Sequence, residues 1–270
     1  MPLKILSLNL WNRDGPWSER AALVRSWLDR LQPDLIGFQE VLRGSGVDQL
    51  HELLDGRGYH TEFARACPFW EDASLDFGNA VASRWPISDT EALNLPNGGL
   101  SDQRVALSVT TESPAGPISF TTTHLMHMLH AGWLREQQVQ AVSGLVLRRR
   151  PRGGLPPIVC GDFNATPDST EMRYMRGLQS IQGKSLFLLD AWEQAGEQSG
   201  GHTFAARNTF CRLAGNRDLR IDYVFVGPSR PEEMGRIERC AVVCDEEQNG
   251  VFPSDHFGVY VELSLDLLRS

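Results

Sequence analysis

Short strand-like runs recur along the whole chain of 270 residues, and helical patterns separate only some of them. The runs are rich in β-branched and apolar residues, and several alternate in polarity as strands do. They lie at Leu3–Leu10, Leu35–Phe38, Asn79–Ser83, Val105–Thr110, Ile118–Thr123, Ile158–Cys160, Ile221–Val226 and Val259–Leu265. Helices are predicted over Ser18–Leu31 and Trp133–Arg149, and the segment from Ser169 to Ala195 is partly helical. Because both short loops and helices join the strands, we predict large mixed sheets with helices outside, not a strict βαβ repeat.

We expect the chain to form a single domain, residues 1–270. Its length suffices for one large α/β domain with a sizeable core. It is 41% hydrophobic and 22% charged, and it has no polar low-complexity segment that would indicate disorder. Neither a break in composition nor a sequence repeat marks a domain boundary.

The sequence predicts a cytoplasmic protein. Its N-terminus is short, apolar and strand-like, without the charged leader and cleavage site of a signal peptide. No run approaches the ~18 apolar residues that a membrane span needs, so no transmembrane segment is expected. Five scattered cysteines complete no zinc pattern and are expected to be reduced, as in the cytosol. They are Cys67, Cys160, Cys211, Cys240 and Cys244.

The formal net charge of −8 constrains the class of ligand. Proteins that hold long nucleic acid non-specifically carry a basic surface, because contacts with phosphates supply most of the affinity. The acidic balance therefore argues against an enzyme that binds duplexes. It leaves open small phosphorylated substrates and phosphates bridged by a metal ion.

Polar side chains stand at the ends of six of the predicted strands. Each alone has an ordinary explanation; Asp162 and Asn164, for instance, could form a turn before Pro167. Six such strand ends together are hard to obtain from turn chemistry, and rigid strand ends are where α/β proteins gather their ligand-binding groups. The residues are Asn9, Gln39, Glu40, Thr123, His124, Asp162, Asn164, Asp222, Ser254, Asp255 and His256.

These residue types suit the hydrolysis of a phosphate ester. Mg²⁺ takes oxygen ligands and keeps several waters, so one or two carboxylates suffice to bind it. Glu40 is the candidate for the direct ligand, and Asp255 could hold the ion directly or through water. We expect Mg²⁺ as the cofactor, with Mn²⁺ or another divalent cation as the alternative.

The remaining strand-end residues suit the positioning and activation of the attacking water and the binding of the phosphoryl group. Asp162 and Asn164 are two positions apart on an extended segment and should point to the same side, so that Asp162 orients the water while Asn164 donates to a phosphate oxygen. His256 would accept a proton from the water, and Asp222 would hold its imidazole in the required tautomer. His124 would donate to the phosphoryl oxygen as negative charge develops there.

Ordered motifs along the chain resemble the endonuclease/exonuclease/phosphatase superfamily. They are LNLW (Leu8–Trp11), QE (Gln39–Glu40), GNAVASRWPI (Gly78–Ile87), TTHL (Thr122–Leu125), GDFN (Gly161–Asn164), RIDYVFV (Arg220–Val226) and PSDHFGV (Pro253–Val259). The resemblance extends from residue 4 to about residue 265, and GDFN followed by SDH is highly specific. The pattern is most similar to neutral sphingomyelinase-like and deadenylase-like members.

The resemblance implies a deoxyribonuclease I-like fold, a four-layer α/β sandwich of two mixed β-sheets packed face to face with helices outside. It also implies metal-dependent hydrolysis of a phosphate ester by in-line attack of water. Glu40 matches the metal-binding glutamate and Asn9 the residue beside it. Asp162 and Asn164 match the pair that positions the nucleophile. Asp222 matches the aspartate that supports the histidine, Asp255 matches the aspartate on the metal side, and His256 matches the histidine itself.

Two sequence positions indicate which branch of the superfamily the chain resembles. His124 stands where sphingomyelinase-like and deadenylase-like members have histidine and abasic endonucleases have tyrosine. Abasic endonucleases also carry an acidic residue two places after the first asparagine, where this chain has Trp11. A role in DNA repair is therefore disfavoured, and the number of metal ions is left open.

Substrate specificity should lie in the loops over the site. Candidate loops are Trp11–Trp17, Ala66–Phe77 and His124–His130, and their aromatic residues include Phe69 and Trp70. The third loop has two interpretations: the start of an amphipathic helix with Leu125, Met128 and Leu129 in the core, or a loop in which His127 or His130 faces the pocket. The residues predicted to contact substrate are Asn79, Arg104, Trp11 and His127.

Three functions are considered. The acidic charge, His124 and the aromatic loops favour a phosphodiesterase or phosphatase acting on a small or lipid-headgroup substrate. The alternative is a nuclease acting on single-stranded or short nucleic acid. Nucleic acid is therefore a possible partner, but not the favoured one. A non-catalytic binding relative would have lost Glu40, Asp162 or His256, and all three are present.

Overall fold

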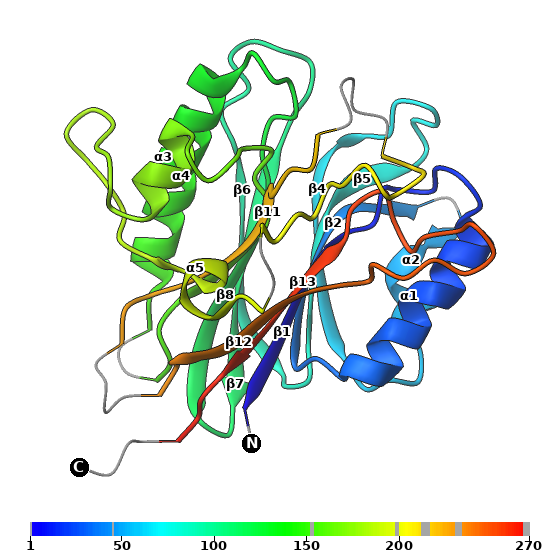
Figure 1. Ribbon diagram of the computed structural model, residues 1–270, viewed down its shortest axis with the longest axis horizontal. Helices are drawn as coiled ribbons and strands as arrows, with labels where there is room; N and C mark the ends of the chain where they lie inside the picture. The colour runs from blue at the N-terminus through cyan, green and yellow to red at the C-terminus, as the bar shows by residue number, and fades with distance from the viewer. Residues whose placement is uncertain are drawn as a thin grey trace.

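Two mixed β-sheets pack face to face, and helices cover both outer surfaces (Figure 1). The computed structural model describes residues 2–44, 46–151, 154–197, 200–211, 217–229 and 234–266. Apolar residues of both sheets meet in a central core, among them Ile5 and Val81 from one sheet and Leu107 and Phe120 from the other. The predicted four-layer sandwich is confirmed.

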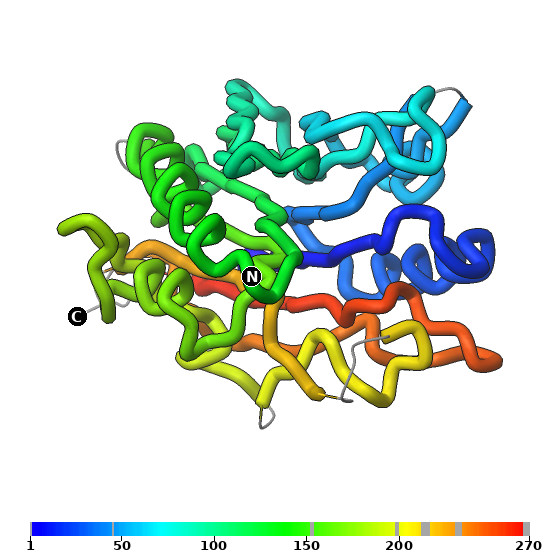
Figure 2. Tube along the Cα trace, turned by 90° about the horizontal axis from the view of Figure 1, so that it is seen from above, coloured from blue at the N-terminus to red at the C-terminus, as the bar shows by residue number. Residues whose placement is uncertain are grey.

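The first sheet contains the first and the last strands of the chain. Its strand order is β12 (Ile237–Val243), β13 (Gly258–Leu263), β1 (Leu3–Asn9), β2 (Leu35–Gly44), β5 (Asp76–Ser83) and β4 (His60–Pro68), and the short β3 (Val47–Asp48) pairs with β2. Strands β1 and β2 are parallel, and the other neighbours are antiparallel. Seen from above, the blue β1 and the red β13 lie side by side in the middle of the molecule (Figure 2).

The second sheet comes from the middle of the chain. Its strand order is β10 (Leu189–Asp190), β11 (Asp222–Val226), β9 (Ile158–Asp162), β8 (Gly116–His124), β7 (Val105–Ser113) and β6 (Ile87–Asn94). Strands β8 and β9 are parallel, and α3 lies in the long crossover connection that a parallel pair requires; the other pairs are antiparallel.

The helices form the outer layers because each presents one apolar stripe. On the first sheet lie α1 (Trp17–Leu31) and α2 (Gln49–Leu54), and on the second lie α3 (Gly132–Arg149) and α4 (Thr170–Met175). Residues of α3 at helical spacing, from Val139 to Val146, are buried against the second sheet. The short α5 (Ala191–Ala195) packs near β11 and β12. Within the described residues, none of the helices has the length and apolar character needed to cross a membrane.

All eight predicted strands and both predicted long helices are present, whereas three strands of seven to nine residues are not predicted from the sequence. These three, β4, β6 and β12, are edge strands of the two sheets. Much of β4 and β6 is exposed, and β12 begins with exposed polar residues before its apolar second half, so the sequences lack the continuous apolar pattern that marks the central strands.

Strand direction and register bring the predicted site residues to one end of the sandwich. In the first sheet, Asn9 at the end of β1 pairs with Gln39 of the parallel β2. In the second sheet, His124 at the end of β8 pairs with Asp162 at the end of the parallel β9. Because β11 is antiparallel to β9, its first residue, Asp222, also pairs with Asp162. Residues distant in sequence therefore converge where the strands end.

Candidate active site

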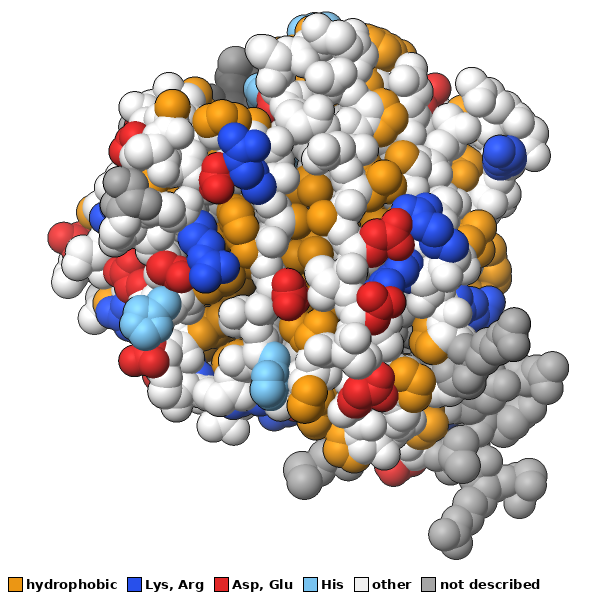
Figure 3. All heavy atoms as spheres, turned by 180° about the vertical axis from the view of Figure 1, so that it is seen from behind, with side chains coloured by type: hydrophobic (Ala, Val, Ile, Leu, Met, Phe, Trp, Pro, Cys, Tyr) orange, Lys and Arg blue, Asp and Glu red, His pale blue; other side chains and the backbone are white. Residues whose placement is uncertain are grey.

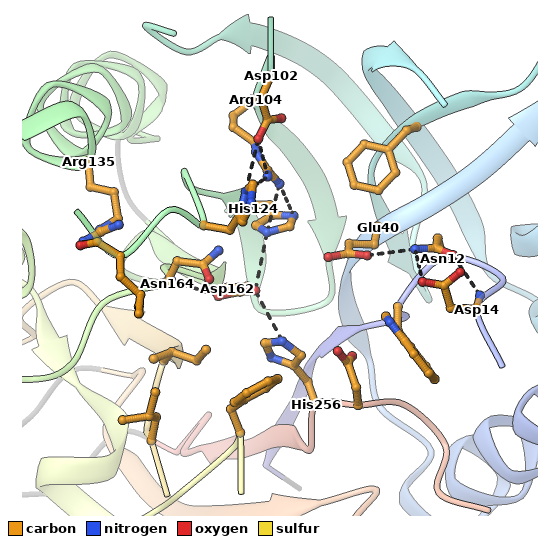
Figure 4. Close-up of a pocket in the computed structure, with 18 of the residues that line it drawn as sticks. Asn12, Asp14, Glu40, Asp102, Arg104, His124, Arg135, Asp162, Asn164 and His256 are labelled. Atoms are coloured by element: carbon orange, nitrogen blue, oxygen red, sulfur yellow. Dashed lines mark hydrogen bonds and ion pairs between the residues drawn. The ribbon is translucent and has the colours of Figure 1, made fainter. Parts of the chain in front are cut away.

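A cleft of about 660 Å³ opens at this end of the sandwich (Figure 4). Nine of the twelve residues predicted for the site line it: Trp11, Glu40, Arg104, His124, His127, Asp162, Asn164, Asp255 and His256. Figure 4 shows Glu40 with Asn12 and Asp14 on one side, Arg104 and His124 on another, and Asp162 between His124 and His256. Asn9 and Asp222 do not line the cleft, but both hydrogen-bond to side chains that do.

Glu40 reaches the cleft because of a β-bulge in β2. Gln39 and Glu40 together stand opposite the single residue Asn79 of β5, and Glu40 has the left-handed φ of 56°. Such a bulge turns a side chain out of the regular alternation, at a cost of order 1 kcal/mol for a non-glycine residue. The Glu40 carboxylate accepts hydrogen bonds from Asn9 Nδ2 at 3.2 Å and from Asn12 Nδ2 at 3.3 Å.

Asp255 and Asp14 line the cleft together with Glu40. Burial, together with the nearby Glu40 carboxylate, raises the pKa of Asp255 to about 7. Carboxylates crowded in this way repel one another unless they bind protons or a cation. The donor set contains only oxygen atoms, the preference of a hard divalent cation, so these residues fit the metal ion that the resemblance implies.

Asp162 connects the groups around it. One of its oxygens, Oδ2, accepts a hydrogen bond from Asn9 Nδ2 at 3.1 Å and lies 3.4 Å from His124 Nε2 and 3.8 Å from His256 Nε2. Burial, followed by the charge of Asp222, raises the pKa of Asp162 to about 7. The carboxylate thus contacts both histidines and, through Asn9, the Glu40 side of the cleft.

Asn164 faces the cleft for a different reason from the one predicted. Strand β9 ends at Asp162, and Asn164 has a left-handed φ of 49°, so the two residues do not share an extended segment. A turn holds Asn164, since its backbone N–H donates to Asp162 Oδ1 at 2.9 Å. Its Nδ2 donates to the carbonyl of Leu125 at 3.1 Å. Asp162 and Asn164 therefore both form the turn and line the cleft.

His256 and Asp222 form a buried pair. His256 Nδ1 lies 2.9 Å from Asp222 Oδ2, and the ring of Phe204 packs on the imidazole at 4.9 Å between centroids. Burial lowers the pKa of His256, but the carboxylates of Asp222, Asp162 and Asp255 outweigh it, so the pKa lies well above 6.5. With Nδ1 at the aspartate, Nε2 is directed toward Asp162 and is the nitrogen that can exchange a proton in the cleft.

His124 has the opposite electrostatic environment. Burial and then the positive charge of Arg104 hold its pKa well below 6.5, so the ring is neutral. Nη1 of Arg104 lies 3.0 Å from each of the two ring nitrogens. Nη2 of Arg104 donates to Asp102 at 2.8 Å and lies 2.9 Å from His127 Nδ1. Arg104 and the neutral His124 therefore stand across the cleft from the acidic group of Glu40 and Asp255.

The other predicted substrate contacts have mixed outcomes. Trp11 lines the cleft and packs on Phe210 at 4.9 Å between ring centroids. Asn79 does not line the cleft; its Nδ2 donates to the carbonyl of Val105 at 2.8 Å and ties one sheet to the other. Of the two interpretations of the loop after His124, the helix start is wrong, because the helix begins at Gly132 and Leu129 is 71% exposed. His127 lines the cleft instead.

Several contributing residues were not assigned a role from the sequence. Asn12, Asp14 and Asp102 line the cleft, and each lies within three residues of a predicted site residue. Two buried arginines, Arg20 and Arg135, hold the loops. A positive charge on the apolar stripe of a helix is the sequence signal that marks both of them.

The two arginines hold the loops through backbone carbonyl groups. Arg20 donates to the carbonyls of Leu10, Trp11 and Asp14 in the loop after β1. Arg135 pairs with the buried Glu171 at 2.6 Å and donates to the carbonyls of Met126 and Met128 in the loop after β8. Both loops carry residues of the cleft, so the arginines fix the backbone from which those residues project.

A second group of side chains could hold a cation. Ligand atoms of Asp162, Asp222 and His256 all lie within 4.8 Å of one another. This set includes an imidazole, which suits zinc and other transition metals better than it suits Mg²⁺. Because His256 Nδ1 already lies at hydrogen-bond distance from Asp222, this group suits proton transfer better than metal binding, and the all-oxygen group suits a hard cation better.

Comparisons with known proteins agree with this geometry. A model of the endonuclease/exonuclease/phosphatase family matches residues 6–256. The chain is 27% identical over 157 residues to Carbon catabolite repressor protein 4 homolog 3 of Arabidopsis thaliana, covering 57% of this chain and 34% of that protein. It is 26% identical over 270 residues to Nocturnin of Xenopus laevis, covering 93% of this chain and 65% of that protein. The chain thus spans less than two thirds of each relative.

A solved structure shares the whole fold. The crystal structure of D. rerio TDP2 complexed with single strand DNA product superposes with a TM-score of 0.76 at 19% identity. The match covers 97% of this chain and 99% of that one. The two-sheet architecture is therefore that of a known fold.

Proposed function

Because the chain belongs to the endonuclease/exonuclease/phosphatase family, we propose that it hydrolyses phosphate esters with a divalent metal ion, water attacking phosphorus in line. Endonucleases, exonucleases and phosphatases share this reaction class and differ in the ester they accept. The observation that carries the proposal is the set of contacts around Asp162. Its carboxylate lies between the neutral His124 and the aspartate-bound His256 and is connected through Asn9 to Glu40.

Glu40 is the proposed direct ligand of the metal ion, with Asp255 and Asp14 beside it. Asn9 and Asn12 orient the Glu40 carboxylate through their amide groups. Mg²⁺ is the proposed ion, and Mn²⁺ is the alternative for the same oxygen atoms. When bound, the cation polarises the phosphoryl oxygen and balances the charge that builds up during the reaction.

The protein groups supply the remaining chemistry. Asp162 accepts a hydrogen bond from the attacking water and so fixes its direction. As the water oxygen bonds to phosphorus and the bond from phosphorus to the ester oxygen breaks, His256 takes the proton of the water at Nε2, while Asp222 holds the Nδ1–H and stabilises the imidazolium that forms. The leaving oxygen takes a proton from solvent water. The neutral His124, on the other side of Asp162, donates its N–H to a phosphoryl oxygen. Asn164 supplies the Nδ2 hydrogen that does not bond to Leu125.

The charge of the cleft favours a small ester over a long polyanion. Among the described residues that line it, the arginines are Arg104 and Arg135, and both are paired with carboxylates. On the face seen in Figure 3, positive and negative side chains are interspersed and form no basic stripe. Binding of long nucleic acid needs many more phosphate contacts. A small phosphodiester or phosphomonoester, a lipid headgroup included, is therefore the proposed substrate.

A nuclease acting on short single strands is the second candidate. It is favoured by the likeness to D. rerio TDP2, whose structure holds a single strand DNA product. A screen with added Mg²⁺ separates the two candidates. It compares bis-p-nitrophenyl phosphate, p-nitrophenyl phosphate, sphingomyelin and a labelled single-stranded oligonucleotide at equal enzyme concentration. Faster turnover of the oligonucleotide than of the small esters would favour the nuclease.

Replacing Glu40 with glutamine tests the metal site. Loss of the carboxylate charge should raise the Mg²⁺ concentration needed for half-maximal activity by about 10–100-fold, the range seen when metal ligands lose their support. Calorimetric titration of metal into the substrate-free protein should show the same loss of affinity. Glu247→Gln, at an exposed position, is the matched control. An unchanged metal response in Glu40→Gln would contradict the assignment.

The stability of the metal-free protein should fall as the pH rises from 6 to 8. Burial raises the pKa of Asp162 and Asp255 from 3.8 to about 7, so the folded state holds protons that the unfolded state has released, and stability is lost as the pH rises toward 7. The raised pKa of His256 acts in the same direction above pH 6.5. Mg²⁺ binds deprotonated ligands, so it should raise the unfolding temperature more at pH 8 than at pH 6.

The unfolding temperature can be followed by circular dichroism at both pH values, with EDTA and with Mg²⁺. Asp255→Asn should flatten the pH dependence and remove most of the Mg²⁺ effect, because it replaces a titrating carboxyl group by an amide. A steeper fall in stability for Asp255→Asn than for the unmodified chain would contradict the assignment of this carboxyl group.

A further inference from the structure

Trp70 is a large aromatic side chain that remains exposed at the rim of the cleft. It lines the cleft and is 65% exposed. Its ring is held from behind, with centroids 4.6 Å from Phe69 and 5.2 Å from Phe77. Both phenylalanines are buried in a small apolar cluster with Leu42 and Leu75. The indole is thus supported by the core while much of its surface remains open.

Aromatic rings connect Trp70 with the reacting centre. Phe77 also lines the cleft and lies 6.4 Å from His124 between ring centroids. His124 Nε2 in turn lies 3.4 Å from Asp162 Oδ2. A wall of rings therefore runs from the rim to the place where the phosphate is proposed to react. A group attached to that phosphate can extend along the wall.

Polar groups border the same wall. Asp102, Arg104 and His127 line the cleft, and the side chain of His127 is 57% exposed. The strand before Trp70 lies beside this cluster, since the charges of Asp102 and Arg104 both act on the Cys67 thiol. An aromatic surface with adjacent hydrogen-bonding groups suits a flat ring with polar edges better than it suits an alkyl chain.

We propose that Trp70 forms a subsite that stacks a planar ring carried by the ester, an aryl group or a nucleobase, while its phosphate lies at His124 and Asp162. The subsite rests on the proposed phosphate-ester chemistry of the cleft and specifies the substrate class. The ring lies on the open part of the indole, and its edge faces His127 and Asp102.

Equilibrium binding of phosphonates, which are not hydrolysed, tests the subsite. The probes are phenylphosphonate, methylphosphonate and octylphosphonate, titrated calorimetrically into the Mg²⁺-loaded protein. Stacking on an aromatic side chain is worth roughly 5- to 150-fold in affinity. We expect phenylphosphonate to bind about tenfold or more tightly than methylphosphonate. Trp70→Ala should bring this ratio close to one, and Trp70→Phe should restore part of it.

Phe187→Ala is the matched control, because Phe187 is 58% exposed and does not line the cleft. It should leave the phenyl-to-methyl ratio unchanged. An unchanged ratio in Trp70→Ala, with the variant folded by circular dichroism, would overturn the subsite. So would a preference for octylphosphonate over phenylphosphonate that depends on Trp70, because it would indicate an alkyl chain. Failure of all three phosphonates to bind would instead count against the proposed phosphate-ester function itself.

Discussion

Replacing His256 with alanine should lower kcat by at least ~10²-fold, the usual scale for the loss of a general base. Nε2 of His256 is the nitrogen that faces Asp162, and Asp222 occupies Nδ1 at 2.9 Å. His124, the other histidine that lies beside Asp162, is a poor substitute as a base, because it lies beside Arg104 and has a lowered pKa. KM should change much less than kcat, since the loss falls on the transition state.

The pH dependence distinguishes a base from a residue that only supports the fold. The pKa of His256 lies well above 6.5 because three carboxylates outweigh burial, so the neutral base forms, and activity rises, only as the pH exceeds 6.5. Asp222→Asn removes one of these carboxylates, which should move the rise to lower pH while reducing the maximal rate. His51→Ala, at an exposed histidine, is the control. An unchanged rate in His256→Ala would remove this residue from the mechanism.

The sequence identifies the central strands and misses edges of the sheets. Strands such as β1 and β9 are buried on both faces and read as apolar runs. Strands β4 and β6 are largely exposed at sheet edges, so many of their side chains are polar and contact solvent. Their strand character comes from neighbours distant in sequence, which a local pattern does not contain.

For the site, too, some features can be predicted from sequence motifs, whereas others depend on the tertiary structure. Strand ends predict the chemistry of Asp162 and His256, and the register of β8, β9 and β11 brings such groups together. Two backbone features of the site cannot be predicted from residue type. They are the bulge that turns Glu40 into the cleft and the left-handed turn at Asn164. Asn79, in a motif with the same appearance, joins the two sheets instead.

Replacing Asp162 with asparagine is the second change expected to have a large effect, a loss of about 10²–10³-fold in kcat. The carboxylate orients the water and accepts the Asn9 hydrogen bond, and an amide there would turn an N–H toward Asn9 Nδ2 or toward the backbone N–H of Asn164. Single-turnover rates at saturating Mg²⁺ measure the chemical step without product release. A loss of less than tenfold would exclude a role in orienting the nucleophile.

Combining Asp162→Asn with His256→Ala tests whether both residues act on the same water. Residues that act as a unit lose little more together than the worse of the two alone, so the double variant should fall well short of the product of the single losses. A fully multiplicative loss would assign them to separate steps.

Stability should change in the opposite direction to activity in Asp162→Asn. Burial raises the pKa of Asp162 to about 7, so above that pH the folded protein holds an unfavourable buried charge, which the neutral amide removes. At pH 8 without metal, removal of this charge should offset the unfavourable contact of the amide N–H with Asn9 Nδ2 or the backbone N–H of Asn164, so the variant should unfold at the same temperature as the unmodified chain or at a higher one. A variant that is both inactive and markedly less stable would place Asp162 in the fold and not in the reaction. An inactive variant of equal or greater stability would mean that the carboxylate is retained for catalysis at the expense of stability.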